Sequence, residues 1–251
     1  MRRPVCCLAV GGSDSGGGAG IQADVQAMAR AGVHGCTVIT ALTAQHPRAV
    51  QRIEPVPLAQ MEAELHAVFD YFDVAVVKTG MLYDAARIGL LDGVLAIRHD
   101  NRPLIIDPVL RASSGWDLLR EGGMGALHAL IERATMITPN VLEAQRLTGA
   151  HEAQGEALLD AMAARWPKCA ILLKGGHAPP EEGGHIVDRL HLPDGSRHCF
   201  PHTRLRLSRD AAHGTGCRLA ALIAAKLAGQ APLLTAVDEA ERLLQEWLAR
   251  S

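Results

Sequence analysis

A thiol follows directly after a glycine turn in one segment of the chain, HGTGC at residues 213–217. An apolar helical pattern begins immediately behind it. The unpaired amides at the start of a helix attract anions, and the same field lowers the pKa of a thiol. We therefore predict that Gly214, Thr215, Gly216 and Cys217 form an anion site for a phosphoryl group, with Cys217 ready as a base. The alternative is a cysteine packed as a small apolar residue.

Two lysines, Lys78 and Lys174, each end an apolar run that reads as a strand. A lysine in that position has its charge at the rim of a sheet, where it can meet a phosphate. Lys174 is the better candidate because two glycines follow it. The alternative is a surface lysine whose stem covers apolar atoms.

Side-chain oxygens that could organise Mg²⁺ occur in Asp107-Pro108 and in the N-x-x-E element of Asn140 and Glu143. Magnesium is usually held by few carboxylates, by water and by nucleotide phosphates. Asp107 and Glu143 are therefore candidate ligands, directly or through water. An N-cap at Asn140 explains the same residues equally well, because a helical pattern follows.

A glycine-rich segment, GGSDSGGGAGIQAD at residues 11–24, opens another helical pattern. Such a loop allows a ligand to approach the backbone. It lacks the Rossmann spacing, and the sequence has neither a Walker A loop nor a G-x-S-x-G elbow. Asp24 is a candidate ligand, although the helix dipole alone favours an acid in a first turn. Gln45 offers both a donor and acceptors for a heterocycle edge, or is an exposed loop residue.

Strand-like and helix-like patterns alternate along the chain, which predicts an α/β fold with a largely parallel sheet covered on both faces. The motifs follow predicted strands, and open α/β sheets bind ligands beyond the carboxyl ends of their strands. Residues 185–192 and 197–207 predict a polar hairpin. Residues 215–229 and 235–249 predict two final helices.

The composition narrows the functional class. The 251 residues suit one large domain, and a net charge of −2 without a basic tract does not indicate nucleic-acid binding. No window of 18 apolar residues predicts a membrane span, and the first residues read as a strand rather than a signal peptide. Six cysteines without a C-x-x-C pair indicate reduced thiols in a cytoplasm. The segment HCFPH, residues 198–202, resembles a metal site but lacks a second ligand pair at a suitable spacing.

Taken together, the motifs resemble those of the hydroxymethylpyrimidine/phosphomethylpyrimidine kinases of thiamine biosynthesis, in the ribokinase-like superfamily. They are GGSDSGGGAGIQAD, VITALTAQ, VKTGML, IIDPV, ITPNVLEA, LLKGGH and HGTGCRLAALIAAKLAG, in order from about residue 6 to 245. The resemblance implies a three-layer α/β/α fold with a mostly parallel central sheet, and one kinase domain over residues 1–251. It also implies a cytoplasmic homodimer that uses ATP and Mg²⁺ to phosphorylate 4-amino-5-hydroxymethyl-2-methylpyrimidine, and then its monophosphate to the diphosphate.

The resemblance also implies site residues. The pyrimidine would meet Gln45, surrounded by Gly12, Ala19, Asp24, Met81 and Val109. The turn at 214–217 would be the anion hole with Cys217 as base, and Lys174 would neutralise phosphate charge. Asn140 and Glu143 would organise Mg²⁺ and the nucleotide phosphates.

Several residues depart from the family pattern. Ser15 replaces a proline in the first loop, and Asp210 stands where Asn or Thr is common. Arg218 follows the cysteine in place of a small residue, and could bind phosphate or point to solvent. The segment 178–184 aligns poorly, so a lid there is not implied. Two alternative functions remain: a pyridoxal or pyridoxine kinase, and a pyrimidine-binding protein without catalysis.

Overall fold

The computed structural model describes residues 3–98, 101–112, 114–176, 185–203 and 208–250. Its strands are β1 (Val5–Asp14), β2 (Gly35–His46), β3 (Ala49–Pro55), β4 (Asp73–Thr79), β5 (Leu104–Ile106), β6 (Met136–Ile137), β7 (Ala170–Leu173), β8 (His185–His191) and β9 (Arg197–Thr203). Its helices are α1 (Gly20–Arg30), α2 (Leu58–Tyr71), α3 (Ala85–Ile97), α4 (Gly123–Ile131), α5 (Val141–Thr148), α6 (Gly155–Arg165), α7 (Arg209–Ala212), α8 (Thr215–Ala228) and α9 (Leu233–Leu248).

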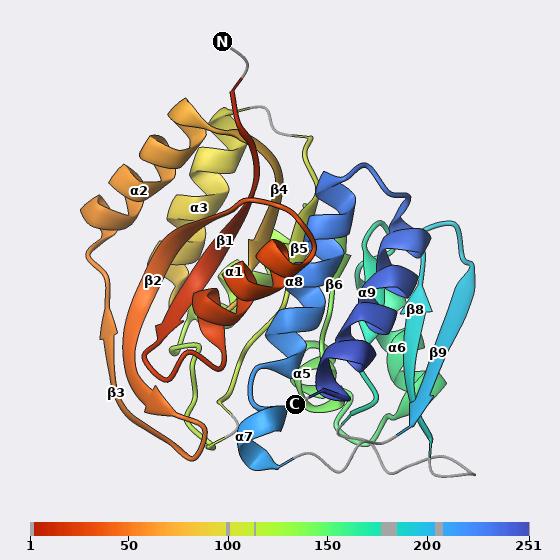
Figure 1. The fold of residues 1–251 in the computed structure, drawn as a ribbon. Helices are drawn as coiled ribbons and strands as arrows, with labels where there is room; N and C mark the ends of the chain where they lie inside the picture. Colours follow the sequence, from red (N-terminus) through yellow and green to blue (C-terminus); the bar gives the residue numbers. More distant parts are fainter. Residues whose placement is uncertain (1–2, 99–100, 113, 177–184, 204–207, 251) are drawn as a thin grey trace.

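The strands form one sheet in the order β3-β2-β1-β4-β5-β6-β7-β8-β9 (Figure 1). The pairs from β2 through β7 are parallel, whereas β3, β8 and β9 pair antiparallel at the two edges. The chain runs from β1 to β2 on one side and later returns to β4 on the other side of β1. The order of the strands therefore reverses between β1 and β4, which is where such sheets open a crevice for ligands.

Helices cover both faces of the sheet, and alternate residues of β1 show why. Cys6, Leu8 and Val10 pack in a core with α2 to α6, whereas Cys7 and Ala9 pack in a second core with α1, α8 and α9. Figure 1 shows α1, α8 and α9 together on one face of the sheet. Side chains of a strand point alternately to opposite faces, so a strand buried on both faces must be apolar throughout. The predicted three-layer α/β fold is confirmed.

The end of β1 and the presence of β3 differ from the sequence prediction. Strand β1 continues through Asp14, because Ser13 and Asp14 pair with Leu42 and Thr43 of β2, so the glycine turn begins only at Ser15. The edge strand β3 was missed. It carries the charged residues Arg52 and Glu54, which are typical of an edge that resists further pairing but weaken an apolar strand pattern.

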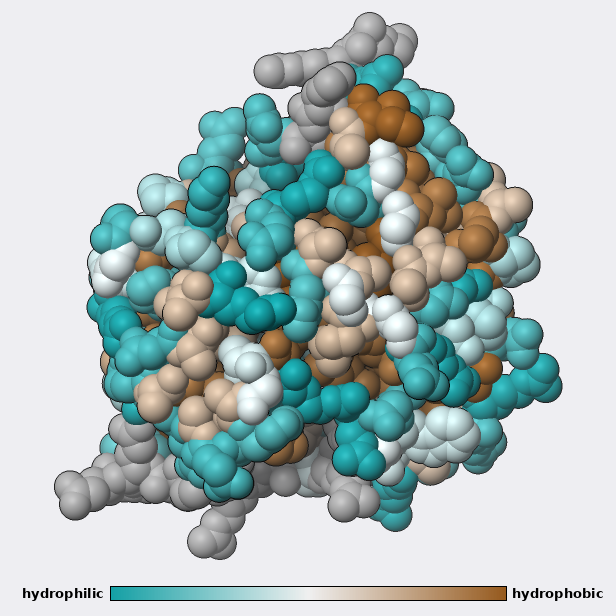
Figure 2. Space-filling view, turned by 180° about the vertical axis from the view of Figure 1, so that it is seen from behind, coloured by the Kyte–Doolittle hydropathy of each residue, from teal (hydrophilic) through white to brown (hydrophobic). Residues whose placement is uncertain are grey.

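The surface is mixed in character. In the view from behind, polar side chains cover most of the face and apolar ones gather toward its upper right (Figure 2). Among the described residues, no helix is both long and apolar enough to span a membrane.

Candidate active site at the carboxyl ends of the strands

A cavity of about 970 Å³ opens at the carboxyl ends of the parallel strands and extends to β8, β9 and α9. Every residue that the sequence analysis proposed for the site lines it: Gly12, Ala19, Asp24, Gln45, Met81, Asp107, Val109, Asn140, Glu143, Lys174, Gly214, Thr215, Gly216 and Cys217. The alternation of strands and helices brings these residues together from most of the length of the chain. The roles given to them remain proposals.

The first turn of α8 faces this cavity. Gly214 caps the helix with a φ of +78°, and a Cβ there would collide with the carbonyl oxygen of Gly18. Only glycine allows this approach of the two loops. Lys174 Nζ lies 3.0 Å from the position of a Cβ on Gly216, so its ammonium group stands beside the first amides of α8. The structure thus places amides and a cation side by side, as an anion site requires.

The thiol of Cys217 is half-buried in this first turn. Burial raises its pKa to about 12, although the charges of Lys78 and Lys174 act in the opposite direction. The prediction of a lowered thiol pKa was therefore wrong. Desolvation outweighs the field of the helix, and the carboxylates of Asp107 and Asp24 add to the rise.

Lys174 forms an ion pair with Asp107, with 2.8 Å between Nζ and Oδ1. Thr138 Oγ1 also donates to this oxygen, at 3.3 Å. Burial opposes the charge on Lys174, but the carboxylates of Asp107 and Glu143 raise its pKa above the usual value. Lys174 is therefore charged at the end of β7, and its contact with phosphate stays a prediction.

Asn140 and Glu143 form a capping box at the start of α5. Asn140 Oδ1 accepts from the Glu143 amide at 2.9 Å, and Glu143 Oε2 accepts from the Asn140 amide at 2.8 Å. The helix-cap alternative of the sequence analysis is thus what the structure shows. Burial raises the pKa of Glu143 to about 7. Both side chains still line the cavity, so the cap does not remove them from the site.

Asp24 and Lys78 form an ion pair of 2.7 Å, and both side chains are fully buried. This corrects two expectations: the charge of Lys78 is not at the exposed rim, and Asp24 lies beyond the first turn of α1. Burial raises the pKa of Asp24 to about 6 against the opposing charge of Lys78. Its Oδ2 is buried without a hydrogen-bond partner among the described residues, and Asp24 lines the cavity. That oxygen can accept from a ligand.

The sequence analysis missed Asp14 and His213. Asp14 accepts from the amides of Gly16 and Ala19, each at 2.8 Å, and its Oδ2 lies 2.9 Å from His213 Nε2. The ring of His213 fills the space where Gly18 has no side chain, and Gln45 Nε2 lies 3.3 Å from it. Burial alone would raise the pKa of Asp14, but these hydrogen bonds lower it to about 2. The available signal for Asp14 was an acid within the glycine-rich segment 11–20.

The side chain of Arg218 is half-buried and has partners within the protein. Its guanidinium lies 5.0 Å from the centre of the Trp247 ring and donates to the carbonyl of His213 at 2.9 Å. It therefore braces the turn before α8 against α9. The segment 178–184 lies outside the described residues.

Comparison of the chain with known proteins agrees with this site geometry. A family model described as phosphomethylpyrimidine kinase matches residues 14–251. The chain belongs to this family. It is therefore a phosphotransferase, and its named relatives act in thiamine biosynthesis.

Two relatives place this kinase within the family. The hydroxymethylpyrimidine/phosphomethylpyrimidine kinase of Rhizobium meliloti is 40% identical over 243 residues, covering 94% of this chain and 88% of that protein. The thiamine biosynthesis bifunctional protein of Geobacter sulfurreducens is 42% identical over 242 residues, covering 94% of this chain. This kinase spans only 48% of that longer protein.

Solved structures confirm the ribokinase-like fold of the kinase. The phosphomethylpyrimidine kinase of Clostridium difficile superposes with a TM-score of 0.81 at 29% identity, covering 98% of this chain and all of that one. An ADP complex of Bacillus subtilis pyridoxal kinase superposes with a TM-score of 0.82 at 27% identity, covering 96% and 90% of the two chains.

Proposed function

We propose that the chain transfers a phosphoryl group from ATP to the hydroxymethyl group of 4-amino-5-hydroxymethyl-2-methylpyrimidine, and then to the resulting monophosphate. One observation carries the proposal: a single cavity joins amide and carboxylate acceptors, Gln45 and Asp24, to the cationic turn at α8. This matches a small polar heterocycle at one end and a phosphate at the other. The names of the relatives support both steps.

The pyrimidine end is proposed to lie at the β1–β4 crevice. Gly12 and Met81 approach so closely that a Cβ on Gly12 would lie 2.8 Å from Met81 Sδ. Together with Ala19 and Val109 they offer flat, apolar walls for a ring. Asp24 Oδ2 and the amide of Gln45 can pair with its exocyclic amine and ring nitrogens.

The phosphoryl end is proposed to lie at the first turn of α8. Phosphoryl transfer depends on positioning and charge neutralisation more than on covalent chemistry. The amides of residues 214–217 and the Lys174 ammonium supply donors and positive charge. Because the pKa of Cys217 is about 12, its thiol holds its proton at rest. As a base, it would need to be deprotonated first, with Lys78 and Lys174 stabilising the thiolate.

Magnesium fits the phosphoryl end of the cavity, but one oxygen of each candidate carboxylate already accepts a hydrogen bond. Asp107 and Glu143 offer the hard oxygens that Mg²⁺ prefers, but Asp107 Oδ1 accepts from Lys174 and Glu143 Oε2 caps α5. The remaining oxygens of the two carboxylates would hold Mg²⁺, directly or through water. When bound, Mg²⁺ neutralises charge on the nucleotide phosphates. Asn140 and Glu143 would position those phosphates through the start of α5.

A coupled assay of ADP release tests the proposal, with MgATP and the hydroxymethylpyrimidine or its monophosphate supplied separately. We expect turnover of both. Binding of the pyrimidine without ATP consumption would instead make the chain a binding protein. Size determination by light scattering would test a further part of the proposal, that one domain over residues 1–251 assembles as a homodimer.

A second candidate, a pyridoxal kinase, is favoured by one observation, the close superposition on the Bacillus subtilis enzyme. A substrate panel in the same assay separates the two. A higher kcat/KM for pyridoxal than for the pyrimidine would replace the first proposal with the second.

A further inference from the structure

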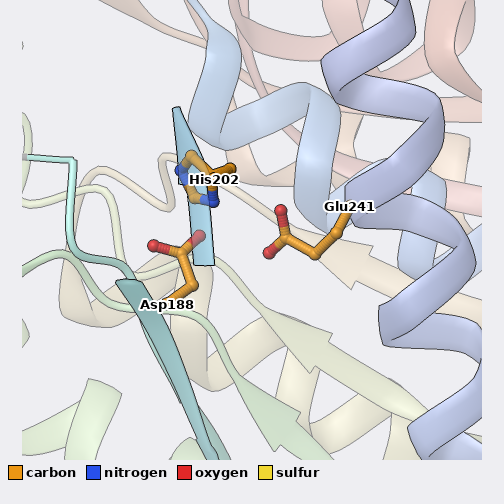
Figure 3. A group of neighbouring side chains, drawn as sticks. All are labelled: Asp188, His202 and Glu241. Carbon is orange, nitrogen blue, oxygen red and sulfur yellow. The ribbon is translucent and has the colours of Figure 1, made fainter. Parts of the chain in front are cut away.

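Three side chains of types that can bind a metal ion meet at the end of the cavity formed by β8, β9 and α9. Asp188 on β8, His202 on β9 and Glu241 on α9 each offer a ligand atom, and these atoms all lie within 4.8 Å of one another. Figure 3 shows the carboxylate of Glu241 and a ring nitrogen of His202 turned toward Asp188. All three residues line the cavity. None of them has a role in the proposed phosphoryl transfer.

The sheet register explains why the two strand residues meet. Asp188 pairs with Phe200, so His202 is its diagonal neighbour on the same face of the β8–β9 ladder. Glu241 reaches this face from α9, which packs beside β9. The further ligands that the segment HCFPH lacks in the sequence are therefore supplied by Asp188 of β8 and Glu241 of α9.

Each side chain is already oriented. Asp188 Oδ1 accepts from the Gly175 amide at 2.6 Å, which leaves Oδ2 for another partner. His202 Nδ1 lies 3.2 Å from the carbonyl oxygen of Phe200. Since a carbonyl only accepts, Nδ1 is the donor in this hydrogen bond, and Nε2 is the ring nitrogen left for a ligand. A hydrogen bond of this kind commonly fixes a metal-binding histidine.

The unsatisfied atom in the cluster is Glu241 Oε1. Glu241 is only 6% exposed, and this oxygen has no hydrogen-bond partner within the described part of the chain. Asp188 beside it is 4% exposed. Two buried carboxylates this close to one another require a shared proton or a metal ion between them. The lysine nearest in the sheet, Lys174, has its ammonium on Asp107 instead.

We infer that Asp188, His202 and Glu241 bind one divalent transition-metal ion, of the class of Zn²⁺ or Mn²⁺, through two carboxylate oxygens and one imidazole nitrogen. Two carboxylates balance the charge of a dication. The imidazole disfavours Mg²⁺, which prefers oxygen ligands alone. Three protein ligands leave coordination positions open toward the cavity.

Calorimetric titration of the full chain with Zn²⁺ tests the inference, after chelator treatment and without nucleotide. Every protein carries Cys199→Ser, because that thiol is exposed and would compete for zinc. We expect one equivalent of Zn²⁺ to bind. Glu241→Gln and His202→Gln should each weaken binding at least about tenfold, whereas His198→Gln, on the same strand, should not.

Thermal unfolding in chelator shows whether the variants fold, and Glu241→Gln is expected to fold because glutamine has the same shape and carries no charge into this buried position. X-ray absorption of the zinc complex should show nitrogen and oxygen ligands only. A sulfur shell near about 2.3 Å would place the ion at a cysteine and overturn the inference. Equal binding by all variants, or binding of less than one equivalent by the parent protein, would overturn it as well.

Discussion

At the scale of single residues, the proposed chemistry depends on what surrounds one thiol. Cys217 lies in the first turn of α8, near the buried Lys78, the half-buried Lys174 and two buried carboxylates. The balance raises the thiol pKa to about 12, so little thiolate exists at neutral pH. A base is needed only in the first phosphorylation, where the acceptor is an alcohol. The acceptor of the second step is already a phosphate anion.

We therefore expect Cys217→Ala to lower kcat for the hydroxymethylpyrimidine by about 100-fold or more, the usual contribution of a general base. The loss for the monophosphate should be under about tenfold. Steady-state rates with each substrate measure both values. Cys199→Ala, which removes an exposed thiol on β9, serves as the control and should change neither rate. Equal losses in the two steps would remove Cys217 from the role of base.

At the scale of elements, the site depends on the docking of two turns. The turn after β1 and the turn before α8 touch at Gly18 and Gly214, where no side chain fits. Asp14 and His213 fasten this contact with a 2.9 Å hydrogen bond between Oδ2 and Nε2. Arg218 holds the second turn from behind through the His213 carbonyl. The pyrimidine and phosphoryl ends of the cavity are aligned by this junction.

Replacing Asp14 by Asn should weaken the junction and lower the free energy of unfolding by up to about 2–3 kcal/mol at pH 7. Hydrogen bonds hold the folded-state pKa of Asp14 near 2, below its value in the unfolded chain. A depressed acid pKa stabilises the fold above the unfolded pKa of about 3.9, and that contribution is lost as pH falls through about 2.

Urea unfolding of the parent chain and Asp14→Asn at pH 7 and near pH 3 measures this effect. The difference between the two proteins should shrink toward the acid end. Asp210→Asn is the matched control, because that carboxylate is 58% exposed in a 3.8 Å contact with Arg48, and it should change stability by less than about 0.5 kcal/mol. A difference that is independent of pH would contradict the assigned pKa.

At the scale of the whole molecule, one cavity spans the sheet from the β1–β4 crevice to the β8–β9 edge. The proposed pyrimidine and nucleotide sites occupy different parts of it. Each ligand should therefore stabilise the folded chain by mass action, at about 2.7 kcal/mol for a concentration of 100 Kd.

Gln45→Ala should abolish the rise in melting temperature caused by the hydroxymethylpyrimidine and preserve the rise caused by ADP. Of the two ligands, the Gln45 side chain is proposed to touch only the pyrimidine. Differential scanning calorimetry with each ligand gives both shifts, and Gln51→Ala on the exposed edge strand should keep both. Loss of the ADP shift as well would show that Gln45 supports the whole cavity rather than the pyrimidine end.

Much of the fold and of the candidate site was predictable, because both follow from local sequence patterns. The apolar strand runs, the glycine turns and their alternation with helical patterns predicted an α/β sheet with motifs at one rim. All fourteen proposed site residues line one cavity for that reason. Strand β3 and the extension of β1 were missed because both depend on pairing with β2 rather than on their own patterns.

The sequence by itself determined the order of the elements, the family and the residues that meet at the carboxyl ends of the strands. Periodicity and glycine turns are local properties, and parallel strands bring their ends to one edge. Only the tertiary structure decided the charge states and partners: the buried pair of Asp24 and Lys78, the raised pKa of Cys217 and the meeting of Asp188 with His202 and Glu241. These depend on burial and on contacts between residues far apart in the chain, which no local pattern encodes.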